Sequence, residues 1–301
     1  MVEPKKAIDV SKHQGKINME SVKAAGIEAV MIRAGYGRYA NQKDPQFERN
    51  ASECERLGIP YGVYWYSYAT TAQEARQEAR CCLEAIKGKT LCLPVAYDIE
   101  YEPGILALNN RQRTELVKAF LGEIEEAGYY GILYASTDFV RNRLNYKELE
   151  RYDVWAAQYG AKCTCPLPYG IWQCSSGNIF GVAGFGKHLD CNWVYKDYHA
   201  LMVKAGLNGH KAEKPDPETK PNEMKNQKLR IGPVSNGDKQ TIEALCSGLG
   251  LDRAGLYTQS SKDGMYTLDI GPVSSGDAWY IMRTCSALGL IEAGLYTAQY
   301  V

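Results

Sequence analysis

The stretch Leu93-Pro94-Val95-Ala96-Tyr97-Asp98-Ile99-Glu100 is an apolar run that ends in two carboxylates. A short apolar run of this length is typical of a buried strand. Side chains alternate between the two faces of a strand, so Asp98 and Glu100 point the same way, about 7 Å apart along it. Glycoside hydrolysis uses such a pair, with one acid held protonated and the other ionised. The stretch therefore predicts a buried strand that carries an acid pair at its carboxyl end.

Further apolar runs lie on both sides of this strand, and helical patterns separate the early ones. The predicted strands are residues 6–10, 28–33, 61–67, 93–99, 130–135, 153–157, 169–174 and about 186–191. The predicted helices cover about 45–57, 71–87 and 111–127, and a glycine follows each at the left-handed position past a helix end. This alternation predicts an α/β fold with a closed, parallel, TIM-like barrel. The connections near 158–168 and 175–186 are short or rich in Gly and Pro, so we expect an irregular second half.

The pattern changes at residues 208–227, which are rich in charge and proline and predict a solvated linker. Beyond it, Ile231–Asp238 (IGPVSNGD) recurs as Ile270–Asp277 (IGPVSSGD). Each repeat predicts a β-α-β unit, with Cys246 and Cys285 on the buried faces of the two helices. We therefore predict a barrel over 1–207, a linker over 208–227, and a small α+β domain over 228–301 with four strands and two helices on one face.

The composition excludes several classes of function. Formal net charge is zero over 301 residues, which argues against nucleic-acid partners and stable membrane association. The first residues contain no apolar signal-peptide core, so we expect synthesis in a cytoplasm. The ten cysteines lack Cys-x-x-Cys spacing and the four histidines lack metal-ligand spacing. We expect mostly reduced thiols, with Cys163-Thr-Cys165 the one cluster suited to metal binding or oxidation.

Two further acids, Asp9 and Asp190, end predicted strands. If the first and last strands are neighbours in a closed barrel, these acids meet Asp98 and Glu100 at one rim. Four carboxylates in one cup raise at least one pKa by repulsion, which suits a general acid. Two alternatives stay open: either outer acid caps a turn or pairs with an arginine such as Arg33, or the cup holds a divalent cation.

Aromatic side chains gather near the same strand ends. Tyr64, Tyr66 and Tyr68 share one face of their strand, and aromatic rings with hydroxyls suit sugars. We assign Trp65, on the opposite face, to barrel packing. The predicted substrate-binding residues are Tyr64, Tyr66, Tyr134, Trp172, Gln173 and Arg33.

Taken together, these segments resemble glycoside hydrolase family 25, the lysozymes that cleave peptidoglycan. The matching pieces come in the family's order over about residues 6–198. They are Ile8-Asp9-Val10-Ser11, Gln14-Gly15, Ile32-Arg33-Ala34, Gly62-Val63-Tyr64-Trp65-Tyr66-Ser67, Tyr97-Asp98-Ile99-Glu100, Tyr134-Ala135-Ser136, Trp155-Ala156-Ala157-Gln158-Tyr159, Ile171-Trp172-Gln173 and Leu189-Asp190-Cys191-Asn192.

The resemblance implies an irregular barrel that hydrolyses the β-1,4 bond from N-acetylmuramic acid to N-acetylglucosamine. Glu100 matches the family's general acid. Asp98 matches its partner, which either assists the substrate's acetamido group or activates water, and Asp9 and Asp190 match two outer acids that shape the site. No metal or cofactor is implied. Tyr64-Trp65-Tyr66-Ser67 departs from the Tyr-His-Phe-like variants of many members, which bears on subsite detail.

The repeat region resembles a SPOR-like module, whose relatives bind bacterial cell-wall glycan. With a lysozyme barrel and no export signal, the whole chain resembles a phage endolysin, which reaches the wall of a Gram-positive host when a holin opens the membrane. The alternatives are a bacterial autolysin or prophage copy, a wall-binding protein with a silent barrel, and a C-terminal module that forms homo-oligomers. A metal-dependent deacetylase is disfavoured because histidine ligands are lacking.

Overall fold

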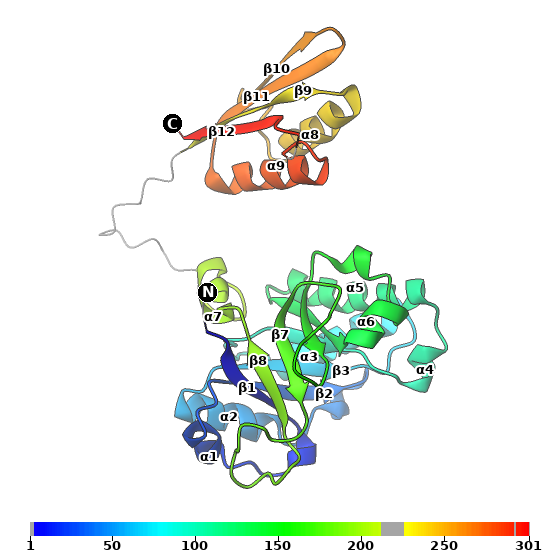
Figure 1. Ribbon diagram of the computed structural model, residues 1–301, viewed down its shortest axis with the longest axis vertical. Helices are drawn as coiled ribbons and strands as arrows, with labels where there is room; N and C mark the ends of the chain where they lie inside the picture. The colour runs from blue at the N-terminus through cyan, green and yellow to red at the C-terminus, as the bar shows by residue number, and fades with distance from the viewer. Residues whose placement is uncertain (1–2, 212–225, 292, 301) are drawn as a thin grey trace, which may run out of the picture. The chain divides into compact units, whose positions relative to one another are not determined.

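The computed structural model describes residues 3–211, 226–291 and 293–300 (Figure 1). The chain divides into two compact units, Met1–Glu213 and Lys214–Val301. Within the described residues, every helix is too short or too polar to cross a bilayer.

The first unit is a closed barrel of eight strands in chain order. They are β1 (Lys5–Val10), β2 (Ala29–Tyr36), β3 (Tyr61–Tyr66), β4 (Val95–Asp98), β5 (Gly131–Ser136), β6 (Asp153–Ala157), β7 (Tyr169–Ser175) and β8 (Asp190–Val194). Strands β1 to β7 are parallel. Strand β8 runs antiparallel to both β7 and β1, so the prediction of an all-parallel barrel is wrong for this strand.

The last strand also begins later than predicted. The predicted range 186–191 overlaps β8 only at its start, because Gly181, Gly184 and Gly186 adopt positive φ and belong to the long loop after β7. Since β8 runs antiparallel, its first residue lies at the rim where the parallel strands end. The register accordingly pairs Asp190 with Asp9.

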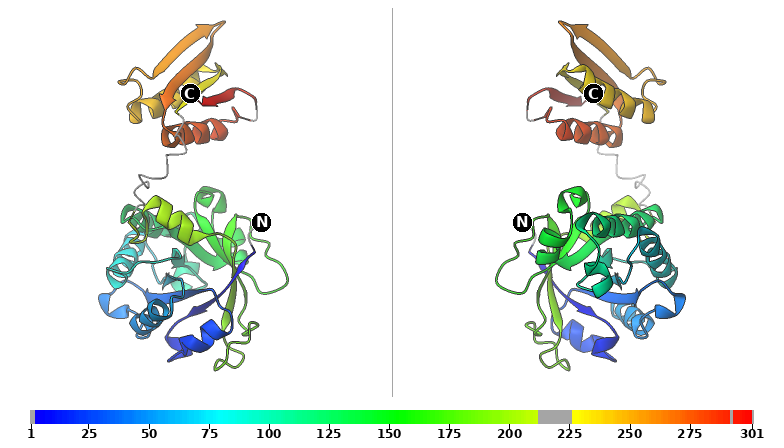
Figure 2. Two further views of the ribbon diagram at one scale, coloured as in Figure 1. Left: turned by 90° about the vertical axis from the view of Figure 1, so that its left-hand side faces the viewer. Right: turned by 90° about the vertical axis from the view of Figure 1, so that its right-hand side faces the viewer.

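Helices lie outside the barrel strands (Figure 2). They are α1 (Met19–Ala24), α2 (Phe47–Leu57), α3 (Ala72–Ala85), α4 (Pro103–Leu106), α5 (Asn110–Glu126), α6 (Thr137–Arg143) and α7 (Tyr198–Ala205), with short 3-10 turns at Lys12–Gln14, Ala40–Gln42 and Tyr146–Leu149. The three predicted helices correspond to α2, α3 and α5. Residues 158–168 and 175–186 contain no helix, as predicted.

Packing between strands and helices forms the core of the barrel. Trp65 is buried and donates a hydrogen bond from Nε1 to the Gly37 carbonyl over 2.8 Å, which confirms its assignment to packing. A Cβ on Gly35 would lie 2.4 Å from the Trp65 ring, so glycine is required there for the close approach.

The barrel unit extends past the predicted start of the linker. Asn208 is fully buried, donates to the Leu93 carbonyl over 3.0 Å, and accepts from the Tyr130 backbone over 2.7 Å. The prediction of a linker beginning at 208 is therefore wrong, because these hydrogen bonds hold the segment against the residues that lead into β4 and β5. The rest of the predicted linker lies largely outside the described residues, and β9 already begins at Gln227.

The second unit is the predicted pair of β-α-β repeats. Its elements are β9 (Gln227–Val234), α8 (Asn236–Gly248), β10 (Tyr257–Lys262), β11 (Met265–Val273), α9 (Ser275–Ala287) and β12 (Tyr296–Tyr300). The strands form one antiparallel sheet in the order β10-β11-β9-β12, with both helices on one face (Figure 1). Cys246 and Cys285 are buried in its own apolar core, as predicted.

Candidate active site

The four predicted acids line one cavity of about 370 Å³ at the carboxyl rim of the barrel. Asp9 lies in β1, Asp98 ends β4, Glu100 follows two residues later, and Asp190 opens β8. Three come from the ends of parallel strands, and the antiparallel direction of β8 brings the fourth. The tertiary structure thus assembles the acid cup that the sequence predicts.

Asp98 and Glu100 form the centre of this cup. The two carboxyl groups lie close enough for their charges to interact, and burial raises the pKa of both. The charge of Glu100 raises the pKa of Asp98 further, and Asp98 Oδ1 is buried without a hydrogen-bond partner in the protein. Two neighbouring carboxylates resist simultaneous ionisation, which favours the form of the pair that carries one proton.

Asp9 is held by two amide donors. Its Oδ2 accepts from Gln173 Nε2 over 2.9 Å and from Asn192 Nδ2 over 2.8 Å. Burial, with the neighbouring charge of Asp190, nevertheless raises the pKa of Asp9 to about 7. Burial also raises the pKa of Asp190. Asp9 therefore lies in a fixed orientation and titrates near neutrality.

Arg33 lines the cavity but does not pair with either outer acid. Its Nε donates to Asp44 Oδ2 over 2.7 Å, and Asp44 is buried. The alternative in which Asp9 or Asp190 serves as the partner of Arg33 is therefore wrong. The buried Arg33 Nη2 has no hydrogen-bond partner in the protein.

Most of the predicted sugar-binding side chains lie at the cavity. Tyr64, Tyr66, Tyr134 and Gln173 all line it. Tyr134 Oη donates to Gln173 Oε1 over 3.0 Å, and Tyr66 Oη donates to Glu102 over 2.6 Å. Because Gln173 accepts from Tyr134 and donates to Asp9, its amide orientation is fixed. Tyr68 instead lines a neighbouring cavity with Lys12 and Tyr36.

Trp172 is a predicted substrate-binding residue that does not line the acid cavity. It is only 8% exposed, donates from Nε1 to the Gln158 carbonyl over 2.8 Å, and packs in an apolar cluster with Cys174 and Cys191. Adjacent strand residues face opposite ways, so the inward side chain of Gln173 turns Trp172 outward. Trp172 therefore lines neither of the two cavities at this rim, in contrast to its predicted place at the substrate groove.

Several cavity residues were not predicted. A second cavity of about 340 Å³ is lined by Tyr101, Ser136, Gln158 and Tyr159, together with Glu100, Tyr134 and Gln173. Glu100 and Tyr159 line both cavities, and Tyr159 is 59% exposed. Gln158 and Tyr159 follow β6 directly in a motif already noted, so their position past a strand end was the available signal. Because Gln158 and Tyr159 lie in a loop, strand alternation could not predict the direction of their side chains.

Potential metal ligands converge elsewhere. Among the described residues, one group of three His, Cys, Asp or Glu side chains has its ligand atoms close together, and it is Cys92, His199 and His210. None of these residues lines the acid cavity. All ten cysteines lie in the described part of the chain and are free thiols, including Cys163 and Cys165.

The raised pKa of Asp9 predicts a pH-dependent stability. A carboxyl whose pKa is raised by folding, here from 3.8 to about 7, contributes stability that is complete below pH 3.8 and is lost as the pH rises through 7. We expect the substitution Asp9→Asn to be more favourable at pH 8 than at pH 4. The change that it makes in the free energy of unfolding should be about 2–4 kcal/mol more positive at pH 8 than at pH 4. Urea unfolding at both pH values measures this. The exposed substitution Glu84→Gln is the control, and equal effects of Asp9→Asn at both pH values would contradict the prediction.

The comparisons with known proteins agree with this geometry. Residues 8–182, more than half of the chain, match the family described as Glycosyl hydrolases family 25. The autolytic lysozyme of Clostridium acetobutylicum is 26% identical over 181 residues, which are 60% of this chain and 53% of that protein. The chain thus spans about half the length of this relative.

Two solved structures share the fold. The modular autolysin LytC from Streptococcus pneumoniae, in complex with a synthetic peptidoglycan ligand, is 27% identical with a TM-score of 0.56, covering 64% of this chain and 47% of that one. The CTP1L endolysin has a TM-score of 0.56 at 21% identity, covering 82% and 80%, and at this identity the likeness concerns the fold alone. On the family match, with the acid cup in its barrel, the chain belongs to glycosyl hydrolase family 25.

Proposed function

We propose that this protein is a lysozyme that hydrolyses the β-1,4 bond between N-acetylmuramic acid and N-acetylglucosamine in bacterial peptidoglycan. The observation that carries the proposal is the convergence of Asp98 and Glu100 with two further acids in one cavity. Family membership supports the reaction class, and the ligand bound to LytC supports the choice of glycan.

Glu100 is assigned as the general acid. It lines both cavities, so its carboxyl group lies where one sugar site adjoins the other. A proton passed from Glu100 to the bridging oxygen allows the bond from that oxygen to the anomeric carbon to break. The raised pKa of Glu100 keeps the proton available, and activity is expected to fall once the pH exceeds that pKa.

Asp98 is assigned as the partner that stabilises the reacting sugar. In this role Asp98 is ionised while Glu100 carries the proton of the pair, and it either orients the substrate's acetamido group or activates water. Asp9 and Asp190 shape the cup around it. The second cavity, with Tyr101, Tyr134 and Tyr159, offers aromatic faces and hydroxyls for the leaving-group side of the glycan.

Mass spectrometry of digested, purified peptidoglycan tests the proposal. The expected products are disaccharide muropeptides with N-acetylmuramic acid at the reducing end. Products with N-acetylglucosamine at the reducing end would indicate a glycosidase that cleaves the other glycosidic bond of the glycan. An intact polymer would overturn the proposal and leave a wall-binding protein with a silent barrel.

We further propose that the enzyme is of the endolysin type and that its C-terminal unit is a SPOR-like module that holds it on the wall. The likeness to CTP1L supports the endolysin type, because it covers more of the chain than the barrel unit contains, and the two β-α-β repeats support the SPOR-like module. The likeness to autolytic enzymes favours an autolysin as the second candidate. Residues 226–301, which carry their own apolar core, are expected to pellet with purified cell walls. A fragment that stays soluble and runs as a dimer would instead indicate oligomerisation.

A further inference from the structure

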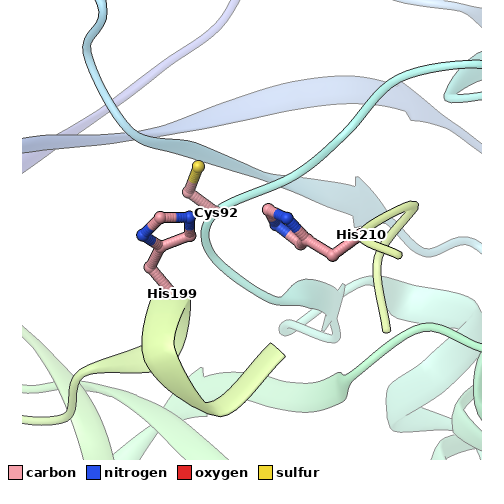
Figure 3. Close-up of side chains that lie close together, drawn as sticks. All are labelled: Cys92, His199 and His210. Carbon is pink, nitrogen blue, oxygen red and sulfur yellow. The ribbon is translucent and has the colours of Figure 1, made fainter. Parts of the chain in front are cut away.

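Three side chains from separate segments of the chain meet at the barrel surface. The thiol of Cys92 and one ring nitrogen each of His199 and His210 all lie within 4.8 Å of one another (Figure 3). Cys92 precedes β4, His199 lies in the first turn of α7, and His210 lies in the segment after α7. The two imidazole rings have centroids 5.2 Å apart.

The cluster lies away from the acid cup. Cys92 lies three residues before β4 begins, whereas Asp98 ends that strand. The cluster is therefore at the amino end of the barrel and the acids at the carboxyl end. In barrels of this type the carboxyl end carries the chemistry and the amino end contributes to stability.

We propose that Cys92, His199 and His210 bind a zinc ion. One thiolate and two imidazoles form the borderline-soft donor set that Zn²⁺ prefers, whereas Mg²⁺ and Ca²⁺ prefer oxygen. Zinc with bonds of about 2.3 Å to sulfur and 2.0–2.1 Å to nitrogen holds its donors roughly 3.5 Å apart. Small side-chain rotations are therefore sufficient. His199 is exposed and Cys92 and His210 are half-buried, so the ion has an entry path and water completes a tetrahedron.

The surroundings of His210 prepare it as a ligand. Its Nε2 lies 3.0 Å from the Leu91 carbonyl, which can only accept, so Nε2 carries the proton and the lone pair is on Nδ1. A ligating histidine typically donates its other nitrogen to such a group. The Cys92 backbone nitrogen donates to the Tyr61 carbonyl over 2.9 Å, which anchors the thiol to β3.

Zinc at this position would connect separate parts of the barrel unit. One ligand precedes a central strand, and the other two come from the last helix and the segment that leads out of the barrel. When zinc binds, the Zn–S bond forms and the Cys92 thiol releases its proton to solvent, so affinity should rise with pH. The ion would thus hold α7 and residues 206–211 against the barrel.

The experiment uses the full chain, stripped with a chelator, with a reducing agent that does not bind metal. Calorimetric titration with Zn²⁺ should give one tight site per chain, and Co²⁺ should produce a thiolate charge-transfer band. Cys92→Ser and His199→Ala should each weaken zinc binding by more than about 100-fold, because a lost ligand costs more than a lost outer partner. Zinc at a hundredfold excess over Kd should raise Tm by roughly 5–10 °C in the wild type.

Cys81→Ser, which changes a half-buried thiol on α3, and His188→Ala, which changes an exposed imidazole, are the matched controls and should bind like the wild type. Equal zinc affinity in the wild type and Cys92→Ser, or a cobalt spectrum without a thiolate band, would overturn the proposal. Glycan cleavage is not the readout, so failure here leaves the proposed lysozyme activity untouched.

Discussion

Glu100→Gln is expected to lower the rate of peptidoglycan hydrolysis by about 10³-fold while leaving the fold intact. The amide keeps the size and the polar contacts of the carboxyl group, but it has no proton to give to the leaving oxygen. Glu100 is the one of the four acids that lines both cavities, so no neighbouring carboxyl is placed to replace it. The release of reducing ends from purified walls measures the rate.

Glu102→Gln is the matched control, because it changes a half-buried glutamate two residues along the same loop. Glu102 accepts a hydrogen bond from Tyr66, and we expect its loss to change the rate by less than about tenfold. Circular dichroism and Tm should match the wild type for both variants. Full activity in Glu100→Gln would show that Glu100 is not the general acid.

Asp98→Asn should lower the rate of hydrolysis by about 10²-fold and make the folded protein more stable. A neutral amide no longer stabilises the positive charge that develops on the sugar, which explains the lost activity. The Asp98 carboxyl is buried beside Glu100, and both effects raise its pKa. The ionised form is therefore costly in the folded protein, so the variant should melt at a higher temperature than the wild type at pH 8.

The two readouts separate a catalytic role from a structural one. Replacing an aspartate with a structural role would lower both activity and stability. Replacing a functional acid whose burial destabilises the fold would lower activity and raise stability. The Tm gain should shrink as the pH is lowered, because protonated Asp98 already resembles asparagine. A lower Tm at every pH would show that Asp98 serves the fold instead.

Local patterns in the chain were sufficient for much of the acid cup. Alternation along a strand placed Asp98 and Glu100 on one side, and chain order placed Asp9 at the same rim. The same alternation, applied to Ile171-Trp172-Gln173, would have turned Trp172 outward once Gln173 was taken as inward. Arg33 was placed correctly at the cavity, but its partner Asp44 lies in a loop, where no periodicity indicates a side-chain direction.

The sequence by itself determined the alternating strands and helices, the acid pair, the repeats of the second unit and the family resemblance, because these depend on short-range spacing and burial. Only the tertiary structure decided the antiparallel direction of β8, the pairing of Asp190 with Asp9, the outward face of Trp172 and the meeting of Cys92 with His199 and His210. The physical reason is that barrel closure and long-range packing bring residues together, and their separation along the chain does not predict their distance in space.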